Sequence, residues 1–140
     1  PNTALPIVAL FGILPYLRAV FENSGMKVNI RESHQASKKS LPGTAAAFAK
    51  GLGIAPSEIL SIRDPKMQVE TLGVPKEFLD GHGYHFVIAT GGGVKIELST
   101  KVHGREAYAL GAIAIAEKLL QPPWDDQCPG LYQLSDVLDS

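Results

Sequence analysis

The sequence is poor in cysteine: Cys128 is the single one among 140 residues. One cysteine cannot form an internal disulfide, and no Cys/His pair has the ligand spacing of a zinc site. The chain is therefore expected to fold without a disulfide and without a metal. The low cysteine content also favours a reducing, cytosol-like compartment.

An excess of charge of one sign is also lacking. The chain has 13 Lys and Arg residues against 14 Asp and Glu residues, which gives a net charge of -1. This balance argues against a broad nucleic-acid-binding face and against a polybasic membrane anchor. An apolar content of 45% with 19% charged residues is typical of a globular domain. Any basic site must therefore be a local cluster.

A long unbroken apolar run is absent as well. The opening stretch PNTALPIVALFGILPYL is interrupted by Pro6, Gly12 and Pro15 and soon meets Arg18. It falls short of the roughly 20 continuous apolar residues of a membrane span, and it lacks the basic leader and cleavage motif of a signal peptide. We expect a buried, kinked helix and no membrane partner. Because the chain does not begin with methionine, we also expect that a segment precedes it.

A dinucleotide-binding fingerprint is the last absence. In that fingerprint a strand is followed by the turn G-x-G-x-x-G and a helix. The stretch GHGYHF lacks the third glycine and precedes a strand, and TGGG joins two strands. The chain is therefore not expected to bind a dinucleotide by itself.

Hydrophobic periodicity predicts a mixture of helices and strands. The strands around the three consecutive glycines are close enough to form an antiparallel hairpin. The predicted elements are, in order, a helix over 5–24, a strand over 26–33, a short helix that Thr44 caps and that stops at Gly51 or Gly53, a short strand over 59–62, a loop-rich segment over 65–83 with one helical turn at 75–79, strands over 84–90 and 94–102, and a helix over 105–120.

This order of elements predicts an α+β fold: a largely antiparallel or mixed sheet of about four strands with helices on one face. Residues 1–121 form the expected domain. Residues 122–140 begin with a Pro-Pro breaker and then carry several apolar side chains, which predicts a C-terminal tail that docks on a surface.

The window ESHQASKKSLPGTA, residues 32–45, carries the first candidate site. His34 and Lys38 lie at the end of a predicted strand, four residues apart. An imidazole titrates near neutral pH and a lysine complements an anion, so the pair suits proton delivery to an anionic ligand. The alternative is a solvated loop of charges, which stays open for either residue alone.

The second half of the window predicts an anion-binding helix terminus. Gly43 and Thr44 open a helix whose first backbone N–H groups are free to bind a carboxylate or phosphate, although Thr44 could simply cap the helix. Arg105, after the last strand, can grip a carboxylate with two parallel N–H groups, or it is only solvated. We expect a structural role for His82 and His85, whose spacing in a strand does not make a metal site.

Taken together, these motifs resemble the plant-type branch of the dihydrodipicolinate reductase family. The window ESHQASKKSLPGTA resembles the family signature of histidine, lysine and S-G-T-A. The segments IRDPKMQVETLGVPKEFLDGHGYHF and VKIELSTKVHGREAYALGAIAIAEKLL, and the tail GLYQLSDVL, are similar to later family segments in the same order. The resemblance covers nearly the whole chain and implies the C-terminal domain of a reductase of lysine biosynthesis.

The resemblance implies roles for the residues of the window. His34 takes the position of the general acid and Lys38 that of its partner in protonation and substrate binding. Gln35 stands where many bacterial members have a second substrate-contacting histidine. Gly43 and Thr44 match the residues that hold a substrate carboxylate.

The resemblance also implies what lies outside the window. Arg105 matches the arginine near the other end of the dicarboxylate substrate, and Asn2, at the hinge, is a candidate contact of the nicotinamide. NADPH or NADH would be bound mainly by an N-terminal Rossmann domain that this chain lacks, so the chain alone is expected to be inactive. A homo-oligomer built through the sheet is implied, in the cytoplasm or, for a plant or alga, the plastid.

The window departs from the family pattern at two positions. Ser40 replaces an aspartate that could orient Lys38, and Pro42 replaces the serine of S-G-T and removes one N–H group from the helix terminus. Two alternatives therefore stay open: a related reductase with a different substrate, and a module that binds a ligand or assembles without catalysis.

Overall fold

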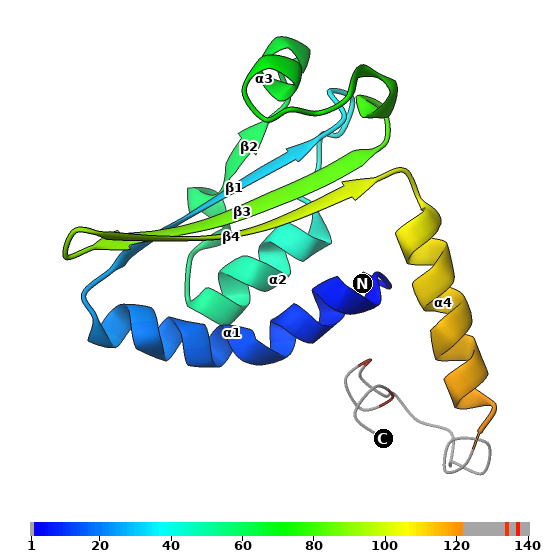
Figure 1. The fold of residues 1–140 in the computed structure, drawn as a ribbon, viewed down its shortest axis with the longest axis horizontal. Helices are drawn as coiled ribbons and strands as arrows, with labels where there is room; N and C mark the ends of the chain where they lie inside the picture. Colours follow the sequence, from blue (N-terminus) through cyan, green and yellow to red (C-terminus); the bar gives the residue numbers. More distant parts are fainter. Residues whose placement is uncertain (1, 122–133, 135–136, 138–140) are drawn as a thin grey trace.

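The computed structural model describes residues 2–121, 134 and 137 (Figure 1). A four-stranded sheet has the order β2-β1-β3-β4, in which β1 is parallel to β2 and the other neighbours are antiparallel. The predicted α+β class and mixed sheet are thereby confirmed. The elements are α1 (Leu5–Asn23), β1 (Lys27–His34), α2 (Gly43–Leu52), η1 (Pro56–Glu58), β2 (Leu60–Ile62), α3 (Pro65–Glu70), η2 (Lys76–Phe78), β3 (His82–Gly91), β4 (Val94–His103) and α4 (Glu106–Leu119).

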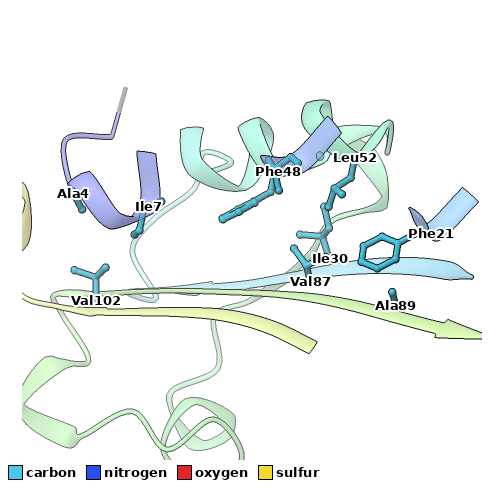
Figure 2. Packing of buried hydrophobic residues seen from close by; sticks show 11 residues of the cluster. Ala4, Ile7, Phe21, Ile30, Phe48, Leu52, Val87, Ala89 and Val102 are labelled. Carbon is cyan, nitrogen blue, oxygen red and sulfur yellow. The ribbon is translucent and has the colours of Figure 1, made fainter. Parts of the chain in front are cut away.

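The main hydrophobic core lies between the sheet and the helices α1 and α2, which cover one face together (Figure 1). Ile30 of β1 and Val87 of β3 meet Phe21 of α1 and Phe48 of α2 (Figure 2), and all four side chains are buried. Burying one large apolar side chain contributes about 1.5–3 kcal/mol. This core holds β1 rigidly, and β1 ends at His34.

The opposite face of the sheet carries a second, smaller cluster. Val74, Tyr84 and Phe86 are buried in it, and the chain between β2 and β3 supplies its cover. Helices α1 and α2 thus share one face, α4 extends away from the end of β4, and α3 and η2 lie at one end of the other face (Figure 1).

Helix α1 runs through Pro15 and bends along its length (Figure 1). By length and composition alone it would also suit a membrane span, because an 18-residue window has a mean hydropathy of 1.6. Its buried residues Ile7, Leu14 and Phe21 pack into the main core. Only these three of its 19 residues are buried, so α1 packs on the core along one narrow face, and the prediction of a buried helix holds for that face alone.

The hairpin of β3 and β4 is confirmed. Its loop consists of Gly92 and Gly93, with φ angles of 55° and 78°. Two successive residues with positive φ are typical of the tight turn whose twist matches a β-hairpin, and glycine adopts this conformation without steric strain.

Two predictions about helices were wrong. The segment after residue 65 was expected to be mostly loop with one turn, but α3 forms there in addition to η2 at the expected turn. The Asp64 carboxylate caps α3 by accepting a hydrogen bond of 2.8 Å from the Lys66 N–H. Thr44 does not cap α2, because the helix already begins at Gly43 and Pro42 occupies the capping position without a side-chain bond.

Helix α4 meets the start of the chain. Thr3 Oγ1 donates a hydrogen bond of 2.8 Å to the Tyr108 carbonyl, and Gly111 is the buried residue of α4. The predicted tail over 122–140 lies almost wholly outside the described residues. Val137 is described and buried, and the docking of the tail remains a prediction.

A buried ion pair fastens β2 to β1. Glu32 of β1 is fully buried and receives two hydrogen bonds from Arg63, of 2.6 and 3.0 Å, just after β2. Ser61 of β2 donates a further short hydrogen bond to the same carboxylate. A strand of three residues is thereby held at the edge of the sheet.

The contact between α4 and the chain start gives a test of this packing. A Cβ added at Gly111 would lie 1.6 Å from the Thr3 carbonyl oxygen, whereas nothing lies within 4 Å of a Cβ at Gly12 in α1. We expect Gly111→Ala to lower the free energy of unfolding by about 1–3 kcal/mol. The control Gly12→Ala should raise it by up to about 1 kcal/mol. Urea unfolding of both variants checks the signs, and equal effects would contradict the observed contact.

The ion pair predicts a pH dependence of stability. Burial by itself raises the pKa of the Glu32 carboxyl, but hydrogen bonds from His34, Arg63 and Ser61 and the charge of Arg63 lower it to about 2. A carboxyl whose pKa is lower in the folded than in the unfolded chain stabilises the fold above its unfolded pKa. This contribution is lost as the pH falls from the ordinary value of 4.5 toward 2.

We therefore expect Glu32→Gln to lower the free energy of unfolding at about pH 7 by about 3 kcal/mol, because it leaves Arg63 without its partner. Between about pH 5 and pH 2.5 the variant should lose less stability than the parent chain. Urea titrations at these pH values measure both effects. The exposed Glu70→Gln in α3 is the control and should keep the parental profile.

Candidate functional site

A pocket of about 190 Å³ lies where β1 and β3 meet the start of α4. Four of the predicted site residues line it: His34, Gln35, Lys38 and Arg105. The end of β1, the loop after it and the start of α4 thus converge on one space, whereas the helix start that the sequence predicted beside His34 and Lys38 was that of α2, at Gly43 and Thr44. The lining residues are His34, Gln35, Lys38, Asp80, Gly81, His82, Gly83, Gly104, Arg105 and Tyr108.

The His34 ring is held between a buried carboxylate and the pocket. Its Nδ1 lies 2.8 Å from Glu32 Oε2, and the side chain is 14% exposed. Its Nε2 edge lies beside Gly83, where an added Cβ would be 3.2 Å from Nε2 and 3.4 Å from the Tyr108 hydroxyl. Gly83 therefore leaves the space in front of the ring open.

Lys38 and Arg105 supply positive charge to the pocket. Neither side chain has a hydrogen-bond or ion-pair partner among the residues that the structure describes. The Lys38 backbone is fixed, because its carbonyl accepts a bond of 3.0 Å from Arg63 Nε and its N–H donates to the Gln35 carbonyl. Asp80 lines the pocket as well, but the two unpaired cations outnumber it, so the pocket suits a small anion.

The predicted anion-binding terminus of α2 does not line this pocket. Gly43 is exposed at the helix start, and Thr44 is half-buried. Asn2 donates a hydrogen bond of 2.8 Å from Nδ2 to the Thr44 hydroxyl, and its Oδ1 accepts one of 2.8 Å from the Ala4 N–H. The structure thus brings Asn2 and Thr44 together, and neither is among the residues that line the pocket with His34 and Arg105.

The neighbouring histidines are neutral by their surroundings. His82 is buried; it donates from Nδ1 to the Phe78 and Leu79 carbonyls and accepts at Nε2 from the Ser33 hydroxyl. Burial lowers its pKa. Burial also lowers the pKa of His85 to about 4, with a further contribution from His34.

These surroundings support the predicted structural role of both histidines. His82 also lines the pocket, in addition to its hydrogen bonds inside the protein. In the described residues no group of histidines, cysteines and carboxylates is arranged to hold a metal ion.

Sequence reasoning missed four residues around the site. Glu32 was part of the candidate window but received no role. Arg63 lies 31 positions away and reaches Glu32 only because β2 pairs with β1. Gln68 of α3 is buried and donates to the carbonyls of His34 and Ile62 at 2.7 and 3.1 Å. Tyr108 could have been noticed three residues after Arg105, one helical turn along the same face.

Known proteins match nearly the whole chain. A probable 4-hydroxy-tetrahydrodipicolinate reductase 2 of rice, named chloroplastic, is 32% identical over 99% of this chain and 45% of its own length. A chloroplastic 4-hydroxy-tetrahydrodipicolinate reductase 1 of Arabidopsis thaliana is 33% identical over 99% of this chain and 42% of its own. The 4-hydroxy-tetrahydrodipicolinate reductase of Anaeromyxobacter dehalogenans is 30% identical over 99% of this chain and 53% of its own length. The chain thus spans about half the length of these relatives.

A solved structure agrees in fold. The dipicolinate-bound dihydrodipicolinate reductase from Paenisporosarcina sp. TG-14 superposes with a TM-score of 0.57 at 20% identity, over 81% of this chain and 45% of that one. The family model described as the C-terminus of dihydrodipicolinate reductase matches residues 7–138. The resemblance seen in the motifs is confirmed, and the chain belongs to the dihydrodipicolinate reductase family, to whose C-terminal part it corresponds.

Proposed function

We propose that this chain is the substrate-binding part of a reductase that converts hydroxy-tetrahydrodipicolinate to tetrahydrodipicolinate in lysine biosynthesis. The observation that carries the proposal is the pocket shared by His34, Lys38 and Arg105, in a chain that named reductases match over 99% of its length. A small dicarboxylate complements its two unpaired cations. A fold relative of this chain is named as dipicolinate-bound.

Each proposed site residue has a role that follows from its side-chain chemistry. Arg105 offers a planar fork to one carboxylate. Gly43 and Thr44 do not line the pocket but stay the proposed contacts of the other carboxylate, because Gly43 is exposed at the start of α2 and the Thr44 hydroxyl, which accepts from Asn2, still has its own proton to donate. His34 and Lys38 are the proposed proton donors, and Gln35 is a further substrate contact.

The size of the pocket supports a small ligand and not a whole nucleotide. A pocket of about 190 Å³ is too small for a dinucleotide, and the sequence has no phosphate-binding glycine turn. NADPH or NADH supplies the hydride in such a reductase, and we propose that it is held mainly by a part of the protein outside this chain. Asn2 remains a proposed contact of the nicotinamide.

The departures from the family pattern lie outside the lining of the pocket, although Pro42 directly precedes the proposed carboxylate contacts Gly43 and Thr44. Ser40 is exposed and Pro42 is buried, and neither lines the pocket. Arg63 already binds the Lys38 carbonyl, so the loop is held without the family's aspartate. The cytoplasm or the plastid is the proposed compartment, and the rice and Arabidopsis relatives are named chloroplastic.

Titration with pyridine-2,6-dicarboxylate tests the proposed site. We expect saturable binding to this chain, weakened about tenfold or more by Lys38→Ala and by Arg105→Ala, because each removes a charge-assisted hydrogen bond. Lys39→Ala and Arg31→Ala are the matched controls, since both residues are exposed and do not line the pocket.

Isothermal titration calorimetry measures all five proteins at one salt concentration. Equal effects of Lys38→Ala and Lys39→Ala would mean that the ligand responds only to net charge. Absence of binding at millimolar ligand would favour the module that assembles without catalysis.

Self-association through the sheet is the second part of the proposal. β4 is an edge strand without a partner strand among the described residues, and Val94 and Ile96 on it are 55% and 42% exposed. We expect Ile96→Lys to shift the chain toward monomer in sedimentation velocity. Leu110→Lys in α4, at a side chain 59% exposed, is the control. If only the control dissociates the oligomer, α4 and not the sheet forms the interface.

A further inference from the structure

The two nitrogens of the His34 ring have different surroundings. Nδ1 lies 2.8 Å from Glu32 Oε2, deep in the protein, where Glu32 is fully buried. Nε2 is on the pocket side, beside Gly83 and the Tyr108 hydroxyl. Only Nε2 is therefore placed to meet a ligand in the pocket.

The charge state of Glu32 decides which ring nitrogen carries the proton. Its carboxyl is ionised near neutral pH, because its hydrogen bonds and Arg63 hold its pKa at about 2. An ionised carboxylate only accepts hydrogen bonds. His34 Nδ1 must then be the donor, so a neutral ring keeps its lone pair on Nε2, and a protonated ring presents its transferable proton there.

Arg63 links this arrangement to Lys38. Its two terminal nitrogens bind the two Glu32 oxygens at 3.0 and 2.6 Å, and its Nε donates to the Lys38 carbonyl at 3.0 Å. A lysine could not make these three bonds at once, because its ammonium is a single point. One guanidinium thus fixes both the carboxylate behind His34 and the backbone that carries Lys38.

We propose that Glu32 and Arg63 are a positioning pair: Glu32 fixes the His34 tautomer with the proton on Nδ1, and Arg63 aligns the Lys38 backbone with it. Nε2 is then the ring atom that exchanges a proton with the ligand. The meaning of this pair for catalysis rests on the proposed reductase function. The tautomer itself depends on no ligand, so its test stands apart from that function.

If Glu32 and Arg63 had only a structural role, they would hold β2 against β1 but would not determine the tautomer of the His34 ring. The two cases differ in the ring-nitrogen chemical shifts of His34, which report the tautomer in NMR spectra. We expect the Nδ1–H form to dominate in the unliganded 140-residue chain, at a pH at which the ring is neutral. Glu32→Gln should change the tautomer ratio about tenfold or more toward Nε2–H, and Glu97→Gln, on an exposed carboxylate of β4, should leave it unchanged.

Two outcomes would overturn the proposal. They are a dominant Nε2–H tautomer in the parent chain, or a tautomer ratio that Glu32→Gln leaves unchanged. If the variant does not fold, the parental tautomer alone decides. Because no ligand is present, these results are independent of the pyridine-2,6-dicarboxylate titration, so either idea can fail while the other holds.

Hydrogen exchange tests the part played by Arg63. Arg63→Lys keeps the charge near Glu32 but removes the bond to the Lys38 carbonyl. We expect the Lys38 N–H to exchange several-fold faster in this variant, while the Ile88 N–H in the centre of β3 keeps its rate. Equal acceleration of both would show that Arg63 only stabilises the fold, and no acceleration of Lys38 would remove it from the positioning pair.

Discussion

The buried carboxylate of Glu32 is the constraint on which the arrangement of the site depends. A carboxylate with no exposed surface destabilises a fold by several kcal/mol unless its hydrogen bonds are complete. Here Arg63, Ser61 and His34 complete them. These partners come from the edge strand β2 and from the end of β1, and Arg63 also binds the Lys38 carbonyl, so satisfying one charge brings together the edge strand, the end of β1 and the loop that follows it.

The site is a continuation of the hydrophobic core along one strand. Side chains two apart on a strand share a face, so Ile30, Glu32 and His34 point to the same side of the sheet. Ile30 is packed in the main core, Glu32 is buried with its ion pair, and His34 reaches the pocket. The packed side chain of Ile30 is thus joined through Glu32 on the same face of β1 to the ring that lines the pocket.

Much of this could be predicted from local sequence. Three signals each depend on a few neighbouring residues: the alternation of apolar residues in the strands, the glycine pair of the hairpin, and the window around His34 and Lys38. The structure shows the helices and strands that these signals imply. The roles of Arg63 and Gln68 could not be predicted, because both depend on the parallel pairing of β1 with β2. The prediction that Thr44 caps the helix was wrong, because threonine is a common capping residue but the capping position is occupied by Pro42 and the helix begins at Gly43.

The charges around the pocket fall into two sets with different surroundings. The charges that hold the architecture, those of Glu32 and Arg63, neutralise each other inside. The charges of Lys38 and Arg105 stay at the surface of the pocket, where water solvates them at little cost to folding. Anion binding therefore needs no rearrangement of the core. Ser40 and Pro42 lie in the same loop and disturb neither set, because the Lys38 backbone is held by its bonds to Arg63 and Gln35.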